Sequence, residues 1–131
     1  MNGKKYQAGL RIRRAVLGKE HVDRAIAEAD EFSLPLQELV TEFGWGGVWA
    51  RPGLSRKVRS LLNLAMLTAL NRPHELRLHL RGAVRNGCTK KEIFEVLLQT
   101  SAYCGFPAAI DSFRVAKDFF LSQDGKARKR D

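Results

Sequence analysis

The amino-acid sequence predicts an all-α protein, a single-domain helical bundle of about six or seven helices. Every substantial segment carries apolar residues at intervals of three and four, as a helix with one buried face does, and none alternates like a strand. Glycine and proline residues separate these segments at ordinary helix lengths. A chain of 131 residues, of which 44% are hydrophobic and 28% charged, fits one domain with a modest core.

Three helices are expected in the N-terminal part. Residues 6–17 form the first, which ends at Gly18; residues 20–31 form the second, and the break at 33–35 starts the third. One apolar stripe of the third helix consists of Leu36, Leu39, Val40 and Phe43. We interpret the Gly-rich stretch 44–53 as a connecting loop, and its two tryptophans predict that it packs over another part of the protein.

The next two helices are separated by a proline. Ser55 is the expected N-cap of a long helix that ends near residue 70 or 71. Because that helix has almost no polar face, we expect it to be the central and most buried one. Pro73 suits the first turn of the following helix, which reaches Asn86 and is closed by Gly87 in the left-handed position.

Two further helices complete the bundle. Residues 89–92 form a capping box, so a helix starts there and continues to about Cys104. Residues 105–107 turn the chain into a last amphipathic helix. The residues of that helix expected to face the core are Ala109, Phe113, Ala116 and Phe120.

The expected organisation is a flexible N-terminal end at residues 1–8, a helical domain at 9–122 and a disordered basic tail at 123–131. No apolar run reaches the roughly 18 residues that cross a bilayer, and no signal-peptide pattern follows the first residues. We therefore expect a cytoplasmic protein with no membrane partner.

Charge and side-chain chemistry narrow the function classes. The formal net charge of +9 attracts anions from nucleic acid to small carboxylates, but no segment resembles a helix-turn-helix or a base-stacking surface, so no nucleic-acid partner is expected. Cys88 and Cys104 form no Cys-x-x-Cys pair and are expected to be free, packed thiols. The three histidines form no His-x-x-x-His pair, so no metal site is expected.

A candidate site lies on the predicted helix that starts at Pro73. Arg72, Glu75 and His79 share one narrow sector at spacings i, i+3 and i+7, beside the apolar stripe. A carboxylate one turn before His79 favours the imidazolium, which could hold a proton near neutral pH; the alternative is a structural hydrogen bond between the two side chains. His74 points to a different face and is expected to be exposed or in a subunit contact.

Three stretches of the chain resemble the γ-carboxymuconolactone decarboxylases, which belong to the larger family that includes the alkylhydroperoxidase D proteins. The stretches are residues 37–42 with Trp45, Gly46 and Trp49; residues 51–54 with 59–66; and residues 72–76 with His79, 81–83, Asn86 and Gly87. The resemblance covers residues 9–121 and includes residues 103–109. It implies an alkylhydroperoxidase D-like helical fold.

One difference separates the chain from the peroxidase branch, which carries two cysteines and, four residues beyond the second, a histidine on this helix. His79 occupies the histidine position, but Arg72 and Glu75 occupy the cysteine positions. A dithiol peroxidase needs one thiolate to attack peroxide and a second thiol to resolve the product. The decarboxylase branch is therefore favoured over the thiol peroxidase.

The resemblance implies decarboxylation of γ-carboxymuconolactone to β-ketoadipate enol-lactone, a step of the β-ketoadipate pathway of aromatic degradation. Loss of carbon dioxide leaves an electron pair that the ring double bond passes to the lactone carbonyl, so the substrate is its own electron sink. No metal or organic cofactor is expected for this reason. The small-molecule partner is a polyanionic lactone.

The protein still has to hold the substrate, keep water away from it and supply a proton, and each of these tasks predicts a type of residue. Arg51 and Arg72 are the candidates that grip a carboxylate, with surface ion pairing as the alternative. Trp45 and Trp49 could form a dry wall against the ring, although ordinary packing also explains them. The candidate proton donor is His79, oriented by Glu75 or Glu42; His74 completes the set of candidate substrate-binding residues.

The resemblance also implies a ring-like homo-oligomer, expected to be a hexamer with pockets near subunit contacts. Two other functions stay open at this point. The first is a thiol peroxidase, which the missing cysteine pair disfavours. The second is a non-catalytic binding protein of the same fold.

Overall fold

The computed structural model describes the backbone of residues 3–130 and the side chains of residues 3–123. Within that range the secondary structure consists of seven α-helices and one π-helix, without a strand, which confirms the all-α prediction. The chain divides into two compact units, Met1–Arg59 and Ser60–Asp131, and each is described by itself. The expected division into a flexible end, one domain and a basic tail stays a prediction.

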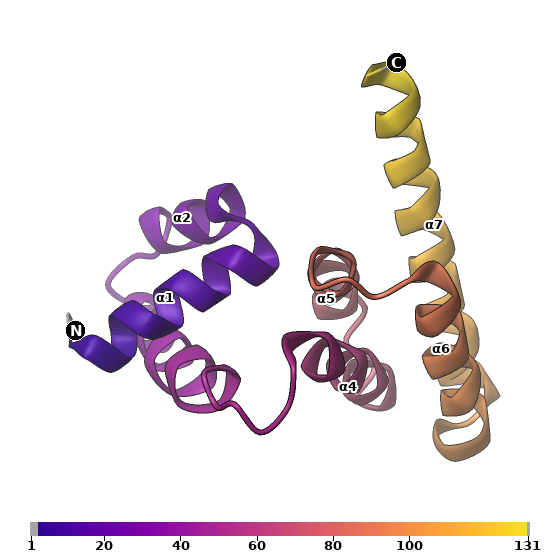
Figure 1. Ribbon diagram of the computed structural model, residues 1–131, viewed down its shortest axis with the longest axis horizontal. Helices are drawn as coiled ribbons and strands as arrows, with labels where there is room; N and C mark the ends of the chain where they lie inside the picture. Colours follow the sequence, from indigo (N-terminus) through magenta and orange to yellow (C-terminus); the bar gives the residue numbers. More distant parts are fainter. Residues whose placement is uncertain (1–2, 131) are drawn as a thin grey trace. The chain divides into compact units, whose positions relative to one another are not determined.

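The first unit contains α1 (Lys4–Leu17), α2 (Lys19–Ala27), α3 (Leu34–Leu39) and the π-helix η1 (Val40–Trp49) (Figure 1). Helix α1 begins at Lys4, inside the stretch expected to be flexible, and ends at Gly18, whose φ of 99° permits the turn into α2. Helix α2 ends four residues before its predicted end at residue 31. The cause is Asp30, whose carboxylate accepts the backbone N–H groups of Phe32 and Ser33 and so favours a turn.

The interpretation of residues 44–53 as a loop was wrong for residues 44–49, which continue a helix with π geometry. The glycines permit a close approach of η1 to α1 instead of a turn. A Cβ on Gly9 would overlap the Thr41 carbonyl oxygen and lie 2.6 Å from the Gly46 nitrogen, and a Cβ on Gly46 would overlap the Lys5 carbonyl oxygen. Gly9 and Gly46 therefore permit contact between the backbones of the two helices.

The core of the first unit forms between α1, α2 and η1. Its buried side chains are Ile12, Val16, Leu17, Val22 and Trp45. Trp49 packs against this cluster and stacks on Trp45, with ring centroids 4.7 Å apart and planes 23° apart. The tryptophans therefore tie η1 to the core, as the sequence predicted when it assigned packing to this stretch.

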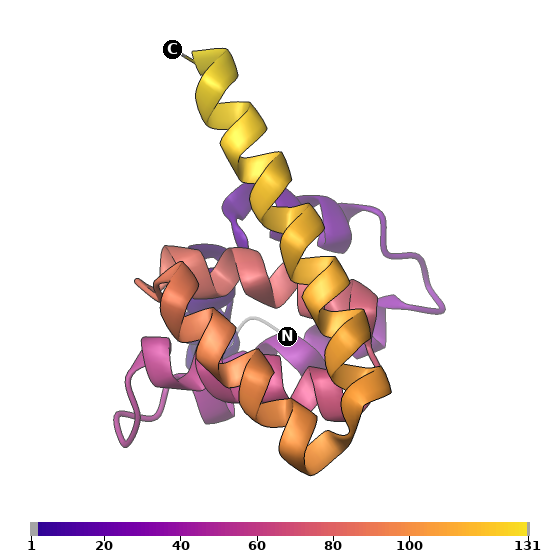
Figure 2. The same cartoon turned by 90° about the vertical axis from the view of Figure 1, so that its right-hand side faces the viewer.

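Helix α4 (Arg56–Ala69) leads into the second unit, which also contains α5 (Pro73–Arg85), α6 (Lys90–Cys104) and α7 (Phe106–Arg130). The predicted caps are confirmed. The Ser55 hydroxyl accepts the Val58 N–H, Gly87 has a φ of 89°, and Thr89 and Glu92 form the reciprocal capping box. Helices α6 and α7 lie side by side and are joined by a short turn (Figures 1 and 2).

The core of the second unit joins α4, α5, α6 and α7 through Leu64, Leu76, Leu80, Ala83, Cys88, Ile93, Leu97, Ala116 and Phe119. In α7 the predicted Ala109 and Ala116 are buried, whereas Phe113 and Phe120 are only partly buried and Phe119 takes the core position. In the described part of the chain, no helix is long and apolar enough to cross a membrane.

The prediction that α4 is the most buried helix was wrong within the single chain. Its buried positions are Ser60, Leu64 and Thr68, which follow one another at intervals of four. Leu62 and Met66 on other faces of the helix are 46% and 51% exposed. Apolar periodicity shows that a face avoids water but does not say which surface covers it.

Candidate active site

His79 is half-buried on α5 beside the core residues Leu76 and Leu80. Its Nδ1 lies 3.4 Å from the side-chain amide nitrogen of Asn63 on α4. A second bridge joins the same two helices, since the Asn86 amide donates to the buried Ser60 hydroxyl over 2.9 Å. Two polar contacts and a shared apolar core therefore hold the imidazole in place.

The pKa of His79 lies below the ordinary histidine value of 6.5 because burial disfavours the charged ring. The negative charge of Glu75, one turn earlier, acts in the opposite direction and only partly offsets burial. Glu75 therefore favours the imidazolium as the sequence predicted, but burial has the larger effect and the net pKa of His79 is lowered. The ring is neutral near neutral pH, because the desolvation outweighs one exposed carboxylate.

The other predicted residues of α5 are exposed. Arg72 stands at the N-cap position, where its guanidinium donates to the Leu70 carbonyl oxygen over 3.2 Å. It lines a cavity of about 420 Å³ together with the buried hydroxyl residues Thr68 and Ser112. Glu75 and His74 are also exposed. Arg72 is thus tethered only to backbone and can be recruited by an anion.

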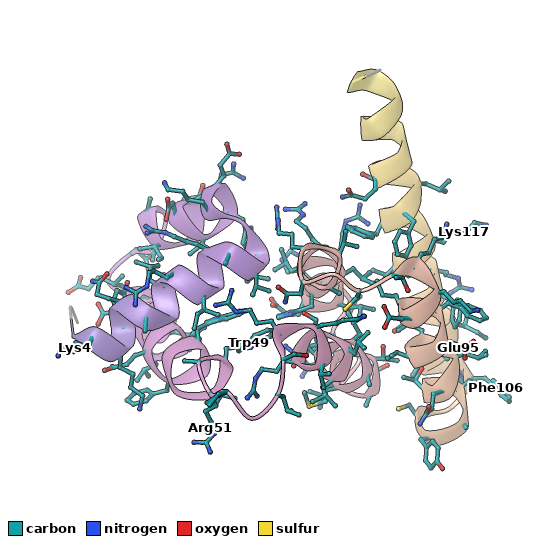
Figure 3. All side chains as sticks on the ribbon, viewed as in Figure 1. Lys4, Trp49, Arg51, Glu95, Phe106 and Lys117 are labelled. Atoms are coloured by element: carbon teal, nitrogen blue, oxygen red, sulfur yellow. The ribbon has the colours of Figure 1, made fainter. Side chains whose placement is uncertain are left out.

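The remaining predicted residues belong to the first unit. Glu42, Trp45 and Trp49 lie on η1, with Trp45 buried and the other two half-buried. Arg51 follows η1 and is exposed, and its carbonyl oxygen accepts a hydrogen bond from Arg59 over 3.1 Å (Figure 3). The candidate site residues therefore form two groups, one on η1 with its C-terminal extension and one on α5.

Two residues with structural contacts to these groups were not assigned a role from the sequence. Asn63 contacts His79, and Arg13 donates to Thr41 at the start of η1. Asn63 had a visible signal, because it is the amide in the otherwise apolar run 61–67. Arg13 had none, since it stands among other arginines in a basic stretch.

A groove of about 750 Å³ in the second unit is lined by α6 and α7 and by none of the predicted site residues. Its walls are mainly apolar, with Phe94, Ile110 and Leu121 exposed. A mainly apolar surface that holds no histidine or carboxylate suits packing against another surface better than proton transfer. We therefore separate this groove from the candidate active site.

Cysteine and metal chemistry find little support among the described side chains. Cys88 is buried, Cys104 is half-buried, and neither forms a disulfide bond. The described residues hold no cluster of three or more His, Cys, Asp or Glu side chains that could bind a metal ion.

The described residues form an all-helical protein, and α5 with its N-cap carries an imidazole, a carboxylate and an arginine. The particular family is shown by its sequence profile, which matches residues 35–118. The chain belongs to the carboxymuconolactone decarboxylase family.

The chain is similar to two decarboxylases with different names. It is 43% identical to a 4-carboxymuconolactone decarboxylase of Acinetobacter baylyi over 88% of this chain and 87% of that protein. It is 46% identical to a nitrosuccinic acid decarboxylase of Metarhizium robertsii over 86% of this chain and 78% of that protein. An uncharacterised 15.0 kDa protein of Paracoccus denitrificans is 33% identical over 80% of this chain. The protein is thus a decarboxylase of this family, and the substrate differs among its relatives.

Proposed function

We propose that the protein decarboxylates γ-carboxymuconolactone to β-ketoadipate enol-lactone without a metal or organic cofactor. The γ-carbon of this lactone bears the departing carboxylate, and the ring double bond conjugates it with the lactone carbonyl. When carbon dioxide leaves, its bonding electrons move into the ring and form a dienolate. Protonation at the α-carbon then gives the enol-lactone, so the protein has to supply binding, charge stabilisation and dehydration.

The observation that carries this proposal is the half-buried, neutral imidazole of His79 on the helix that also bears Arg72 and Glu75. A neutral ring in a partly dehydrated place can interact with a developing enolate more strongly than an exposed one can. Two roles are open to it. As an imidazolium it protonates the α-carbon, and as a neutral ring it donates a hydrogen bond to the enolate oxygen.

The other proposed roles follow from charge and shape. Arg72 and Arg51 are exposed guanidinium groups that suit the retained carboxymethyl group, because a guanidinium binds a carboxylate through two hydrogen bonds. Trp45 and Trp49 offer stacked indoles as an apolar wall. Either Glu75 or Glu42 is proposed to orient the imidazole, and His74 to contact the substrate.

Nitrosuccinate is a second candidate substrate, favoured by the 46% identity to the decarboxylase named for it. Like the lactone, nitrosuccinate carries its own electron acceptor, because the carbon that loses carbon dioxide is joined to a nitro group. It also retains a carboxylate on the neighbouring carbon. The shared chemistry is therefore an activated carboxylate beside a second carboxylate that an arginine can hold.

The test is a comparison of kcat/KM for the two substrates with the same purified protein, with released carbon dioxide as the readout. The proposal predicts a preference for γ-carboxymuconolactone of about tenfold or more, since a pocket built for the lactone ring gains about 1.4 kcal/mol or more from it. Equal or better turnover of nitrosuccinate would contradict the substrate assignment but keep the reaction class. Arg72→Lys is expected to raise KM for whichever substrate is used.

We also propose that the protein works as a homo-oligomer, with a hexamer as the expected form. Two surfaces support association: the exposed apolar side chains of α4 and the groove along α6 and α7. Figure 3 shows Phe106 on the outside of the pair formed by α6 and α7. A monomeric protein rarely exposes this much apolar surface. Light scattering at micromolar concentration tests the proposal, and a monomer would contradict it.

A further inference from the structure

Asn63 is the polar group of α4 that faces the candidate catalytic ring. Its amide nitrogen lies 3.4 Å from Nδ1 of His79, and its neighbours on the helix are Leu62 and Leu64. An amide nitrogen carries two hydrogens and no accessible lone pair, so in this arrangement it donates and Nδ1 accepts. A ring that accepts at Nδ1 carries its own hydrogen on Nε2.

The neutral state of the ring is consistent with this direction of the hydrogen bond. A neutral imidazole has one N–H and one lone pair, whereas an imidazolium has two N–H groups and no lone pair. A donor that faces Nδ1 therefore stabilises the neutral ring and disfavours the charged one. Burial lowers the pKa of His79 as well, and Glu75, whose charge raises it, is exposed on the same helix.

The packing of α4 on α5 keeps Asn63 in register with the ring. Ser60 stands three residues before Asn63 on α4 and receives the hydrogen bond of Asn86, which lies seven residues beyond His79. The two hydrogen-bonded bridges are therefore separated by about one turn along α4 and by about two turns along α5. Leu64 packs with Leu80 next to them, so the contact depends on a rigid part of the core.

We infer that Asn63 is a positioning residue, which holds His79 as the Nε2–H tautomer so that the neutral ring offers this N–H to the enolate oxygen of the substrate. The inference rests on the proposed function for its second half only. In this arrangement His79 keeps its proton throughout, and the dienolate takes its α-proton from water. Of the two roles open to His79, this arrangement favours the neutral ring that donates a hydrogen bond over the imidazolium that protonates the α-carbon.

The test uses ¹⁵N-labelled protein at pH 7.5, with nitrogen NMR of the histidine rings and His79→Gln to assign the signal. The ring nitrogens distinguish the two tautomers directly. Wild type is expected to show Nε2–H for His79. Asn63→Asp places an acceptor at Nδ1 and is expected to put a proton there, and Asn63→Leu removes the donor and is expected to give a mixture of tautomers.

Turnover is measured on the same variants with γ-carboxymuconolactone. Both are expected to lower kcat by about 10- to 100-fold with little change in KM, because the ring is misdirected but the carboxylate anchors remain. Asn86→Leu is the matched control, since it breaks the other bridge between the same helices. It is expected to lower stability without changing the His79 signal.

A wild-type ring that carries its hydrogen on Nδ1 overturns the inference, and so does an Asn63→Asp signal identical to that of wild type. The NMR readout needs no substrate and therefore does not depend on the proposed function. If wild type fails to turn over the lactone, the proposed function falls while the tautomer assignment is still decided.

Discussion

The guanidinium of Arg13 on α1 donates to the hydroxyl of Thr41 on η1 over 3.0 Å, and both residues are buried. The same guanidinium donates to the side-chain carbonyl of Gln37 over 2.8 Å. The Thr41 hydroxyl in turn donates to the Gln37 backbone carbonyl over 2.7 Å. This network fixes the start of the π-helix that carries both tryptophans of the candidate site.

Arg13→Met is expected to lower the free energy of unfolding by about 2–4 kcal/mol, because it leaves buried acceptors without a donor. The aliphatic part of the side chain is kept, so lost packing contributes little. Urea unfolding followed by circular dichroism measures the effect. Arg14→Met, which removes the surface ion pair with Asp23, is the control and should cost less than about 1 kcal/mol. Equal losses for the two variants would contradict the role given to Arg13.

Gly9→Ala is expected to destabilise the protein by about 1–3 kcal/mol or more, because the added methyl group overlaps backbone atoms of η1 that cannot move aside cheaply. Gly44→Ala is the matched control on η1 itself, where an added Cβ meets nothing within 4 Å. Alanine suits a helix better than glycine, so this control should be neutral or stabilising by up to about 1 kcal/mol. The comparison of urea midpoints checks the close approach of α1 and η1.

Helix positions could be predicted from the sequence far better than the packing partners of the helices. Ser55, Gly87 and the Thr89–Glu92 capping box marked helix ends correctly because caps act through atoms a few residues away. Residues 44–49 could not be predicted as helical, because Gly46 is required by a close approach to the backbone of Lys5, which is distant in the sequence. For the same reason the apolar faces of α4 did not reveal what covers them.

His79→Gln is expected to leave the fold intact and to lower kcat by about 10²- to 10³-fold, since it removes the imidazole N–H that is proposed to donate to the enolate oxygen. Steady-state kinetics with γ-carboxymuconolactone provide the measurement, and circular dichroism checks the fold. His21→Gln on α2 is the control for the loss of one histidine elsewhere. Turnover at the wild-type rate in folded His79→Gln would remove this residue from the mechanism.

Stability is expected to fall as the pH drops below about 6.5, because the pKa of His79 is lower in the folded chain than in the unfolded chain. At a pH between the folded and the unfolded pKa of His79, the unfolded chain binds more protons than the folded chain. The contribution of His79 to the free energy of unfolding is therefore complete above pH 6.5 and is lost as the pH falls through the lowered pKa of the folded chain. The pKa values of the Asp23 and Asp30 carboxyl groups are also lowered in the folded chain, so their contribution to stability is lost only as the pH falls below about 3.8.

The check for this pH effect is the urea midpoint of wild type and of His79→Gln between pH 5 and 7.5. Wild type should lose stability toward pH 5, and the variant should lose less because glutamine does not titrate. Identical slopes for the two proteins would show that His79 is not buried as a neutral ring.

The candidate site was predictable in its residue types but not in its electrostatics. The helical spacing in the sequence placed Arg72, Glu75 and His79 on one sector of a helix. In the structure Glu75 and His79 lie on α5 and Arg72 is its N-cap. The charge state of His79 could not be read from its carboxylate neighbour, because burial by other helices decides it. Asn63 is 16 residues away in sequence, so its contact with the ring emerges only when α4 packs on α5.

The most direct test of the central claim is the carbon dioxide yield from γ-carboxymuconolactone with chelator-treated protein, followed together with the ultraviolet absorbance of the lactone. Cofactor-free decarboxylation by the substrate's own electron sink predicts one equivalent of carbon dioxide per lactone consumed, at an undiminished rate after chelation. Carbon dioxide release no faster than in buffer alone, or a rate restored only by an added metal ion, would contradict the account.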